Sequence, residues 1–76
     1  MEKYLNLNGN SSVVGFDIGF DFIWVYFSNK TKYLYTDKIT GKNEVETMER
    51  LAQQGRDLGT YLGRKPYKRH SKKGTW

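Results

Sequence analysis

The amino-acid sequence predicts a small α+β protein in which an antiparallel β-meander of three to four strands packs on one α-helix, with a basic C-terminal tail. Its 76 residues leave room for one domain. Residues 11–37 are rich in β-branched and aromatic side chains interrupted by Gly and Asn, which is typical of short strands and turns. Residues 43–55 instead repeat apolar side chains at helical spacing. We therefore expect an N-terminal arm over 1–10, a folded domain over 11–69 and a disordered tail over 70–76.

Three predicted strands make up the meander. The first two cover about 12–18 and 22–28, and the third covers 32–37. The links between them are three residues long, and links this short connect antiparallel neighbours. A short edge strand at 4–7, within the N-terminal arm, is the fourth.

The predicted helix has a start signal and a stop signal. Asn43 is a suitable N-cap, and Glu46 three residues later completes a capping-box arrangement. Gly55 is a natural C-terminal stop, and 58–62 can dock as a short turn beyond it. The apolar stripe consists of Val45, Met48, Leu51 and Ala52. This stripe is expected to lie on the sheet.

The positive charge of the sequence is concentrated near its C-terminal end. The formal net charge is +5 at pH 7. Residues 1–55 hold six Lys and Arg against seven Asp and Glu, a balance of −1, whereas 56–76 hold seven against one, a balance of +6. A localised basic segment is the usual electrostatic footprint of a polyanionic partner, and it also keeps a small protein soluble.

The sequence lacks the residue patterns that most catalytic and metal sites need. It has no Cys and a single His, which excludes disulfides and zinc sites built from Cys and His. His70 falls in the predicted tail, where nothing would orient it for catalysis. Asp17 and Asp21 lie near a predicted sheet turn, where Asp commonly binds its own backbone. We therefore expect a protein that is not an enzyme, with no catalytic residue, no metal and no cofactor.

The N-terminal residues do not form an apolar stretch of signal-peptide length. No apolar run in the sequence approaches the ~20 residues that span a bilayer. We expect a cytoplasmic protein that does not associate with membranes.

Several landmarks occur in a fixed order along 11–69. Val14-Gly15-Phe16-Asp17 is followed by Tyr33-Leu34-Tyr35, and Pro66-Tyr67-x-Arg69 closes the segment. This order resembles the KTSC domain, a small domain found at the C-terminus of some lysyl-tRNA synthetases and as stand-alone bacterial proteins. That family tends to read Ile-Gly-Tyr-Asp at the first landmark and Tyr-x-Tyr at the second. The resemblance implies a small α+β domain and suggests RNA binding, from the proteins in which the domain occurs.

The chain departs from the family pattern in a way that bears on function. Trp24, Tyr26 and Leu34 stand where the family tends to have polar or charged residues. Large aromatic side chains on a face that a single helix cannot cover are expected to meet a ligand, the N-terminal arm or another subunit.

Two registers of the second hairpin are compatible with the sequence. A two-residue turn at 29–30 sets Tyr26 opposite Tyr33 and Trp24 opposite Tyr35, so that all four aromatic residues share one face. A slip of one residue exchanges the two faces of a strand, so the register decides which aromatic residues are exposed.

The second register uses a three-residue turn at 29–31. It sets Phe27 opposite Tyr33 and Val25 opposite Tyr35, and the family resemblance favours it. Tyr33 and Tyr35 then lie beneath the helix. The residues facing away from the helix are Trp24, Tyr26, Lys32 and Leu34.

The first predicted function is a non-catalytic binding module for RNA, or for another nucleic acid or nucleotide. Aromatic side chains on a sheet stack unpaired bases, and Lys and Arg contact phosphate. The predicted binding residues are Trp24, Tyr26, Tyr33 and Tyr35 for stacking and Arg56, Arg64, Lys65, Lys68 and Arg69 for phosphate.

The alternative function is an oligomeric protein-interaction or nucleotide-sequestering protein, of the kind that a phage could encode against a host protein. A chain this short has a thin core, so a homo-oligomer, most simply a two-fold dimer, is expected. Binding stoichiometry and salt dependence distinguish the two functions, and the residue list is similar for both.

Overall fold

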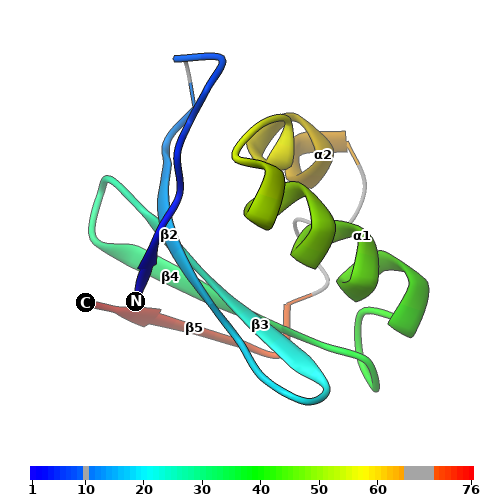
Figure 1. Cartoon of the computed structure of the whole chain (residues 1–76). Coiled ribbons are helices and arrows are strands. Elements are labelled where there is room, and N and C mark those ends of the chain that lie inside the picture. The colour runs from blue at the N-terminus through cyan, green and yellow to red at the C-terminus, as the bar shows by residue number, and fades with distance from the viewer. Residues whose placement is uncertain (10, 65–69) are drawn as a thin grey trace.

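The computed structural model describes residues 1–9, 11–64 and 70–76, and in them both helices lie on one side of a five-stranded antiparallel sheet (Figure 1). The order of the strands in the sheet is the order of the strands in the chain. The α+β meander predicted from the sequence is therefore confirmed, with one strand and one helix more than expected. The elements are β1 (Glu2–Lys3), β2 (Val13–Ile18), β3 (Phe22–Phe27), β4 (Thr31–Thr36), α1 (Lys42–Gln54), α2 (Leu58–Arg64) and β5 (Lys72–Thr75).

A β-bulge in β2 decides which of its side chains face the helices. The register against β3 shifts between Val13 and Gly15, which makes Val14 the extra residue. Side chains alternate along a regular strand, so Val13 and Phe16 would otherwise lie on opposite faces. With the bulge both are buried in the core, and Asp17 lies on the opposite side of the sheet.

The turn between β3 and β4 comprises 28–30, one residue earlier than the predicted three-residue turn. The Lys30 N–H donates to the Phe27 carbonyl at 3.0 Å, and the Asn29 side-chain oxygen accepts from the Thr31 N–H at 3.0 Å. Lys30 adopts a left-handed φ of 70°. This conformation closes a three-residue hairpin loop without a glycine.

The observed register corrects both predicted pairings. Val25 lies opposite Tyr33, and Ile23 lies opposite Tyr35. The observed register differs from the second predicted register by two residues. Because side chains alternate with a period of two, each side chain keeps the face that the second register predicted. Tyr33 and Tyr35 point to the helices, and Trp24 points away from them.

The N-cap of helix α1 lies two residues before the predicted one. Gly41, with φ of 109°, is the N-cap and makes no side-chain capping hydrogen bond, so the prediction of Asn43 at this position is wrong. The Gly41 carbonyl accepts from the Val45 N–H at 3.0 Å. The predicted end is confirmed, because Gly55 adopts a left-handed φ of 80° and its N–H donates to the last turn.

The core lies between the sheet and the two helices. Helix α1 contributes the predicted stripe, and α2 adds Leu58 and Leu62, which are 0% and 1% exposed. Tyr35 is completely buried, and Tyr33 is 7% exposed. The core also holds Tyr4, Val13, Phe16, Ile23, Val25, Val45, Met48 and Ala52.

The two ends of the chain depart most from the sequence-based expectations. The N-terminal edge strand is at Glu2–Lys3 rather than at 4–7, and Tyr4 is buried, its hydroxyl accepting from the Leu58 N–H at 3.2 Å. The prediction of a disordered tail over 70–76 is wrong, because Lys72–Thr75 pair with β4 as β5. Backbone pairing needs no apolar side chain, so apolar patterning could not predict this strand.

We expect that deleting residues 71–76 lowers the melting temperature. The deletion removes the β4–β5 ladder and the hydrogen bond from Trp76 N–H to the Lys30 carbonyl at 3.0 Å. A loss of about 1–2 kcal/mol of net hydrogen bonding corresponds to a fall of roughly 4–16 °C in a domain of this size. Thermal unfolding followed by circular dichroism measures it.

The matched control for the deletion is Lys72→Ala with Lys73→Ala, which keeps the backbone of β5 and should leave the melting temperature nearly unchanged. If the deletion variant has the same melting temperature as the full chain, β5 adds nothing to stability.

Candidate functional site

The sheet face away from the helices, here called the outer face, carries aromatic and basic side chains together. Its members are set by the β3–β4 register, in which Trp24 lies opposite Leu34 and Tyr26 opposite Lys32. These four side chains are partly exposed. Both helices pack on the other side of the sheet (Figure 1). The sequence-based prediction that Trp24 and Tyr26 point away from the helix is therefore confirmed.

Trp76 joins this aromatic surface from the C-terminal end of β5. Its ring centroid lies 5.6 Å from that of Tyr26, at an interplanar angle of 88°. The indole N–H donates to the Phe27 carbonyl at 3.1 Å, and 38% of the residue stays exposed. Sequence reasoning missed Trp76 because it assigned the tail to disorder. The available signal was a large aromatic residue in a segment that otherwise had nothing to pack.

Lysine side chains lie over these rings. The Lys32 Nζ is 4.5 Å from the ring centroid of Trp24 and 5.8 Å from that of Tyr26. The Lys30 Nζ is 4.2 Å from the Trp76 ring. Cation–π contacts of this kind contribute about 0.5–1 kcal/mol when exposed, so they are readily exchanged for contacts with a ligand.

Two further lysines border the outer face on the neighbouring strands. Lys3 of β1 lies opposite Gly15, and Lys72 of β5 lies opposite Leu34. Both are exposed. The positive charge of this face thus comes from β1, β4, β5 and the β3–β4 turn rather than from the basic C-terminal segment alone.

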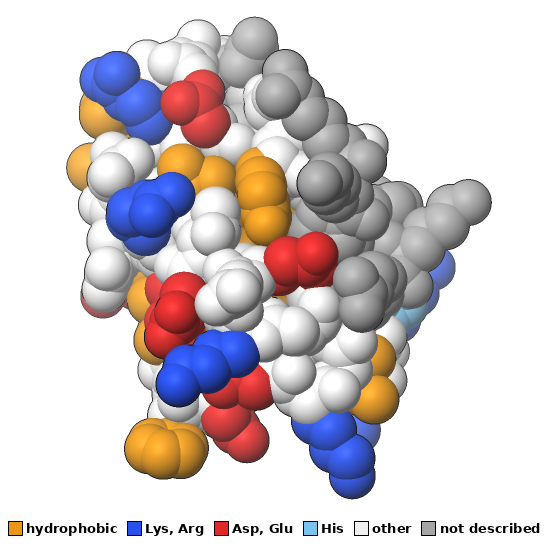
Figure 2. Space-filling model, turned by 90° about the vertical axis from the view of Figure 1, so that its right-hand side faces the viewer, with side chains coloured by type: hydrophobic (Ala, Val, Ile, Leu, Met, Phe, Trp, Pro, Cys, Tyr) orange, Lys and Arg blue, Asp and Glu red, His pale blue; other side chains and the backbone are white. Residues whose placement is uncertain are grey.

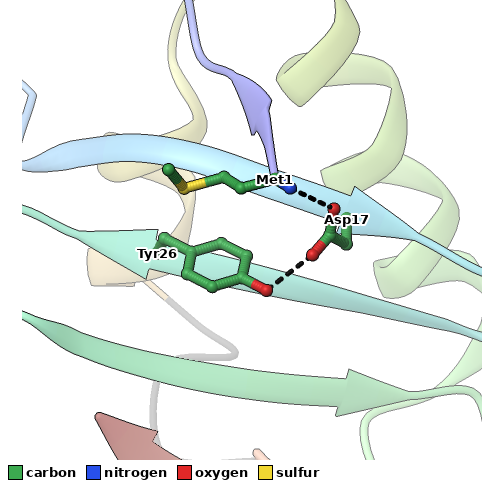
Figure 3. Close-up of polar contacts among 3 residues, drawn as sticks. All are labelled: Met1, Asp17 and Tyr26. Carbon is green, nitrogen blue, oxygen red and sulfur yellow. Dashed lines mark hydrogen bonds and ion pairs between the residues drawn. The ribbon is translucent and has the colours of Figure 1, made fainter. Parts of the chain in front are cut away.

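A carboxylate is fixed among these groups, as Figure 3 shows. The Tyr26 hydroxyl donates to Asp17 Oδ2 at 2.5 Å, and the Met1 amino group lies 3.3 Å from Asp17 Oδ1. The hydrogen bond from Tyr26 is the main reason why the pKa of Asp17 is lowered. Burial first, and then the neighbouring Asp17, raises the pKa of Tyr26 to about 12. At neutral pH the pair is therefore a carboxylate and a protonated phenol.

Both pKa shifts predict a dependence of stability on pH. The contribution of Asp17 to the free energy of unfolding is present above its unfolded-state pKa and is lost as pH falls through its lowered folded-state pKa. The contribution of Tyr26 to the free energy of unfolding is present below its usual pKa of 10.0 and is lost as pH rises toward 12. We expect Tyr26→Phe to show a smaller loss of stability than the wild type over this alkaline range, measured by urea unfolding at several pH values. Equal alkaline slopes for the two proteins would contradict the assigned contact.

Three of the remaining predicted site residues, Tyr33, Tyr35 and Arg56, lie away from the outer face. Tyr33 and Tyr35 are core residues with almost no surface on which a base could stack, so their assignment as stacking residues is corrected. Arg56 is exposed in the turn between α1 and α2, on the helix side. Arg64 is the last residue of α2. Lys65, Lys68 and Arg69 lie outside the described residues, as does the Pro66-Tyr67 landmark.

The helix side differs from the outer face in its charge pattern. Figure 2 shows acidic and basic side chains interspersed on it, with apolar side chains between them. The half-buried Glu49 has a raised pKa, first because of burial and then because Asp37 and Glu46 lie near it. Among the described residues, the positive charge of this side is therefore offset by neighbouring carboxylates.

Three further observations concern the part of the chain that the structure describes. No group of three or more His, Cys, Asp or Glu side chains there could hold a metal ion. Neither helix is long and apolar enough to cross a bilayer. His70, which was expected to be disordered, lies with its ring centroid 4.5 Å from that of Tyr33.

Comparisons of the chain with protein-family models, with curated proteins and with solved structures give no match. The resemblance to the KTSC domain therefore stays a prediction from the quoted motifs, and the outer face is interpreted from its own geometry.

Proposed function

We propose that this protein binds single-stranded RNA on the outer face of its sheet. The observation that carries the proposal is the pairing of aromatic rings with lysines on a surface that neither helix covers: Lys32 lies over Trp24, and Lys30 lies over Trp76. Single strands are bound in this way because each nucleotide offers a flat base and a charged phosphate.

The aromatic residues supply the stacking part of this function. Trp24 lies on β3 and Trp76 directly follows β5, so that β4 lies between these two partly exposed residues in the sheet. Base–aromatic stacking contributes about 1–3 kcal/mol per base and tolerates any sequence. The lysine that covers each ring must move to admit a base, and its ammonium group is then close enough to bind the adjacent phosphate.

The lysines supply the electrostatic part. Lys3, Lys30, Lys32 and Lys72 surround the aromatic surface, whereas the carboxylate of Asp17 is already engaged by Tyr26 and the Met1 amino group. Each phosphate that is neutralised releases counterions from the strand, so binding should weaken as the salt concentration rises.

Fluorescence anisotropy with a labelled single-stranded RNA of mixed sequence tests the proposal. With three to four phosphate contacts the slope of log K against log salt should be about −2 to −3, a loss of roughly 20- to 50-fold in affinity between 50 and 200 mM salt. The same RNA as a duplex should bind more weakly because its bases are already stacked.

A matched pair of lysine variants locates the interface. Lys32→Ala should reduce the steepness of the salt dependence by about 0.7, the value for one contact to a single strand. Lys42→Ala removes an exposed lysine at the start of α1, on the helix side, and should leave the slope unchanged. Equal effects of the two changes, or equal binding of duplex and single strand, would reject the outer face as the interface.

A further inference from the structure

The outer face presents a carboxylate, that of Asp17, in a position where it opposes phosphate binding. Its side chain is 42% exposed, so a ligand on this face can reach it. Each Asp17 oxygen has one described partner, and a carboxylate oxygen accepts two hydrogen bonds. The group therefore retains the capacity to accept hydrogen bonds from a ligand.

The register places this carboxylate beside the stacking surface. Asp17 of β2 lies directly opposite Trp24 of β3. The Cβ atoms of such pairs are about 4.5–5.5 Å apart, and their side chains lie on the same face. A base stacked on the Trp24 indole would thus have one edge beside the Asp17 oxygens.

Tyr26 holds the carboxylate in place. The 2.5 Å hydrogen bond from its hydroxyl restricts the rotation of Asp17, and the phenol is a donor that stays protonated at neutral pH. Asp17 is therefore a positioned acceptor, and Tyr26 is a positioning residue for it (Figure 3).

The bases differ in what they can offer to such an acceptor. Guanine presents two adjacent donors on its Watson–Crick edge, the N1–H and the N2 amino group, which match the two oxygens of a carboxylate. Adenine, cytosine and uracil each place an acceptor next to their donor, and that acceptor would face a carboxylate oxygen unfavourably. We propose that Asp17 gives the outer face a preference for guanine by accepting these two hydrogen bonds from a base stacked on Trp24. This inference rests on the proposed function.

Oligouridylates of about eight nucleotides with one central guanine, inosine or adenine test the inference by fluorescence anisotropy. Inosine lacks the N2 amino group and keeps the N1–H. The wild type should bind the guanine strand tighter than the adenine strand by about 5- to 150-fold, the range for one good bidentate contact to a base, and should bind inosine with intermediate affinity.

Asp17→Asn should bring the three affinities to within about twofold of one another and should leave the adenine strand bound as well as before or better, because a repulsive charge is removed. Tyr26→Phe keeps the ring and releases the carboxylate, so it should reduce the preference only in part. The matched control is Asp21→Asn, at the exposed tip of the β2–β3 hairpin, which should retain the full preference.

The outcomes distinguish this inference from the function on which it rests. The guanine preference is rejected if the wild type binds guanine and adenine strands equally. It is also rejected if Asp17→Asn lowers the affinity for all three strands by the same factor. Either result leaves the proposal of RNA binding intact. If the wild type binds none of the strands, both proposals fail. Circular dichroism confirms that each variant is folded, and Asp17→Ser replaces Asp17→Asn if the latter is not.

Discussion

Tyr35→Ala is expected to lower the free energy of unfolding by about 3–5 kcal/mol, the range for truncation of a large aromatic residue in a core. Tyr35 is 0% exposed, lies opposite Ile23 in the sheet and packs with Tyr33 at a centroid distance of 6.4 Å. A domain of 76 residues has a total stability of roughly 4–11 kcal/mol. The substitution should therefore unfold a large fraction of the protein, which urea unfolding at 25 °C would measure.

Phe20→Ala is the matched control for this truncation. Phe20 is 103% exposed at the tip of the β2–β3 hairpin, so its removal should change stability by less than about 0.5 kcal/mol. A stable Tyr35→Ala variant with weakened RNA binding would restore Tyr35 to the binding residues predicted from the sequence and would contradict its place in the core.

Trp24→Ala is expected to weaken RNA binding by about 1–3 kcal/mol, or roughly 5- to 150-fold, because it removes a stacking surface. The partial exposure of Trp24 means that the loss of stability should be smaller than for Tyr35→Ala. Anisotropy titration gives the affinity, and urea unfolding of the same variant gives the stability. Phe20→Ala again serves as the control, since it removes an exposed aromatic residue from the β2–β3 turn, outside the strands that form the outer face.

Light scattering on the Trp24→Ala variant tests the competing interpretation. If Trp24 lies in a homo-oligomer interface, the variant should have a lower molar mass than the wild type, and its stability should fall by about 3–5 kcal/mol. That result, with RNA affinity unchanged, would favour the oligomeric interaction protein over the RNA-binding module.

The central hairpin was largely predictable, because alternation along β3 is regular. Ile23 and Val25 are fully buried and Trp24 is partly exposed between them, as period-two patterning indicates. The exact register was not predictable, since it depends on a lysine in a left-handed conformation at Lys30. Left-handed turns are normally recognised by Gly or Asn, and Lys gives no such signal.

The bulge at Val14 and the cap at Gly41 illustrate two other limits. An extra residue in β2 leaves no mark in a run of β-branched and aromatic side chains, yet it reverses the faces of the residues before it. Near the start of α1, Asn43 satisfied the usual capping preference, but the turn from β4 brings the backbone into helical geometry already at Lys42. Tertiary constraints outweighed a local preference there.

The candidate site was predictable only where it lies on β3 and β4, because Lys32 was expected on this face whereas Trp76 was not. Trp24 and Tyr26 follow from the alternation of one strand, which is local information. The lysines of the outer face come from four elements, and the pairing that gathers them involves residues far apart in sequence, such as Leu34 with Lys72. A count of charge along the chain points to 56–76, of which Lys65, Lys68 and Arg69 lie outside the described residues.

The strand order of the sheet has a consequence for how the protein folds and exchanges its amide hydrogens. The pairs β2–β3 and β3–β4 join consecutive segments and close short loops, whereas β5 pairs with β4 only after a long excursion through both helices. Contacts between segments far apart in sequence form late, and an edge strand with exposed side chains opens at low free energy. Amides of β5 should therefore exchange faster than those of β3. The Trp24 part of the outer face should therefore stay formed when β5 opens, whereas the Trp76 part should be lost, so an RNA strand bound there would keep only one of its two stacking surfaces.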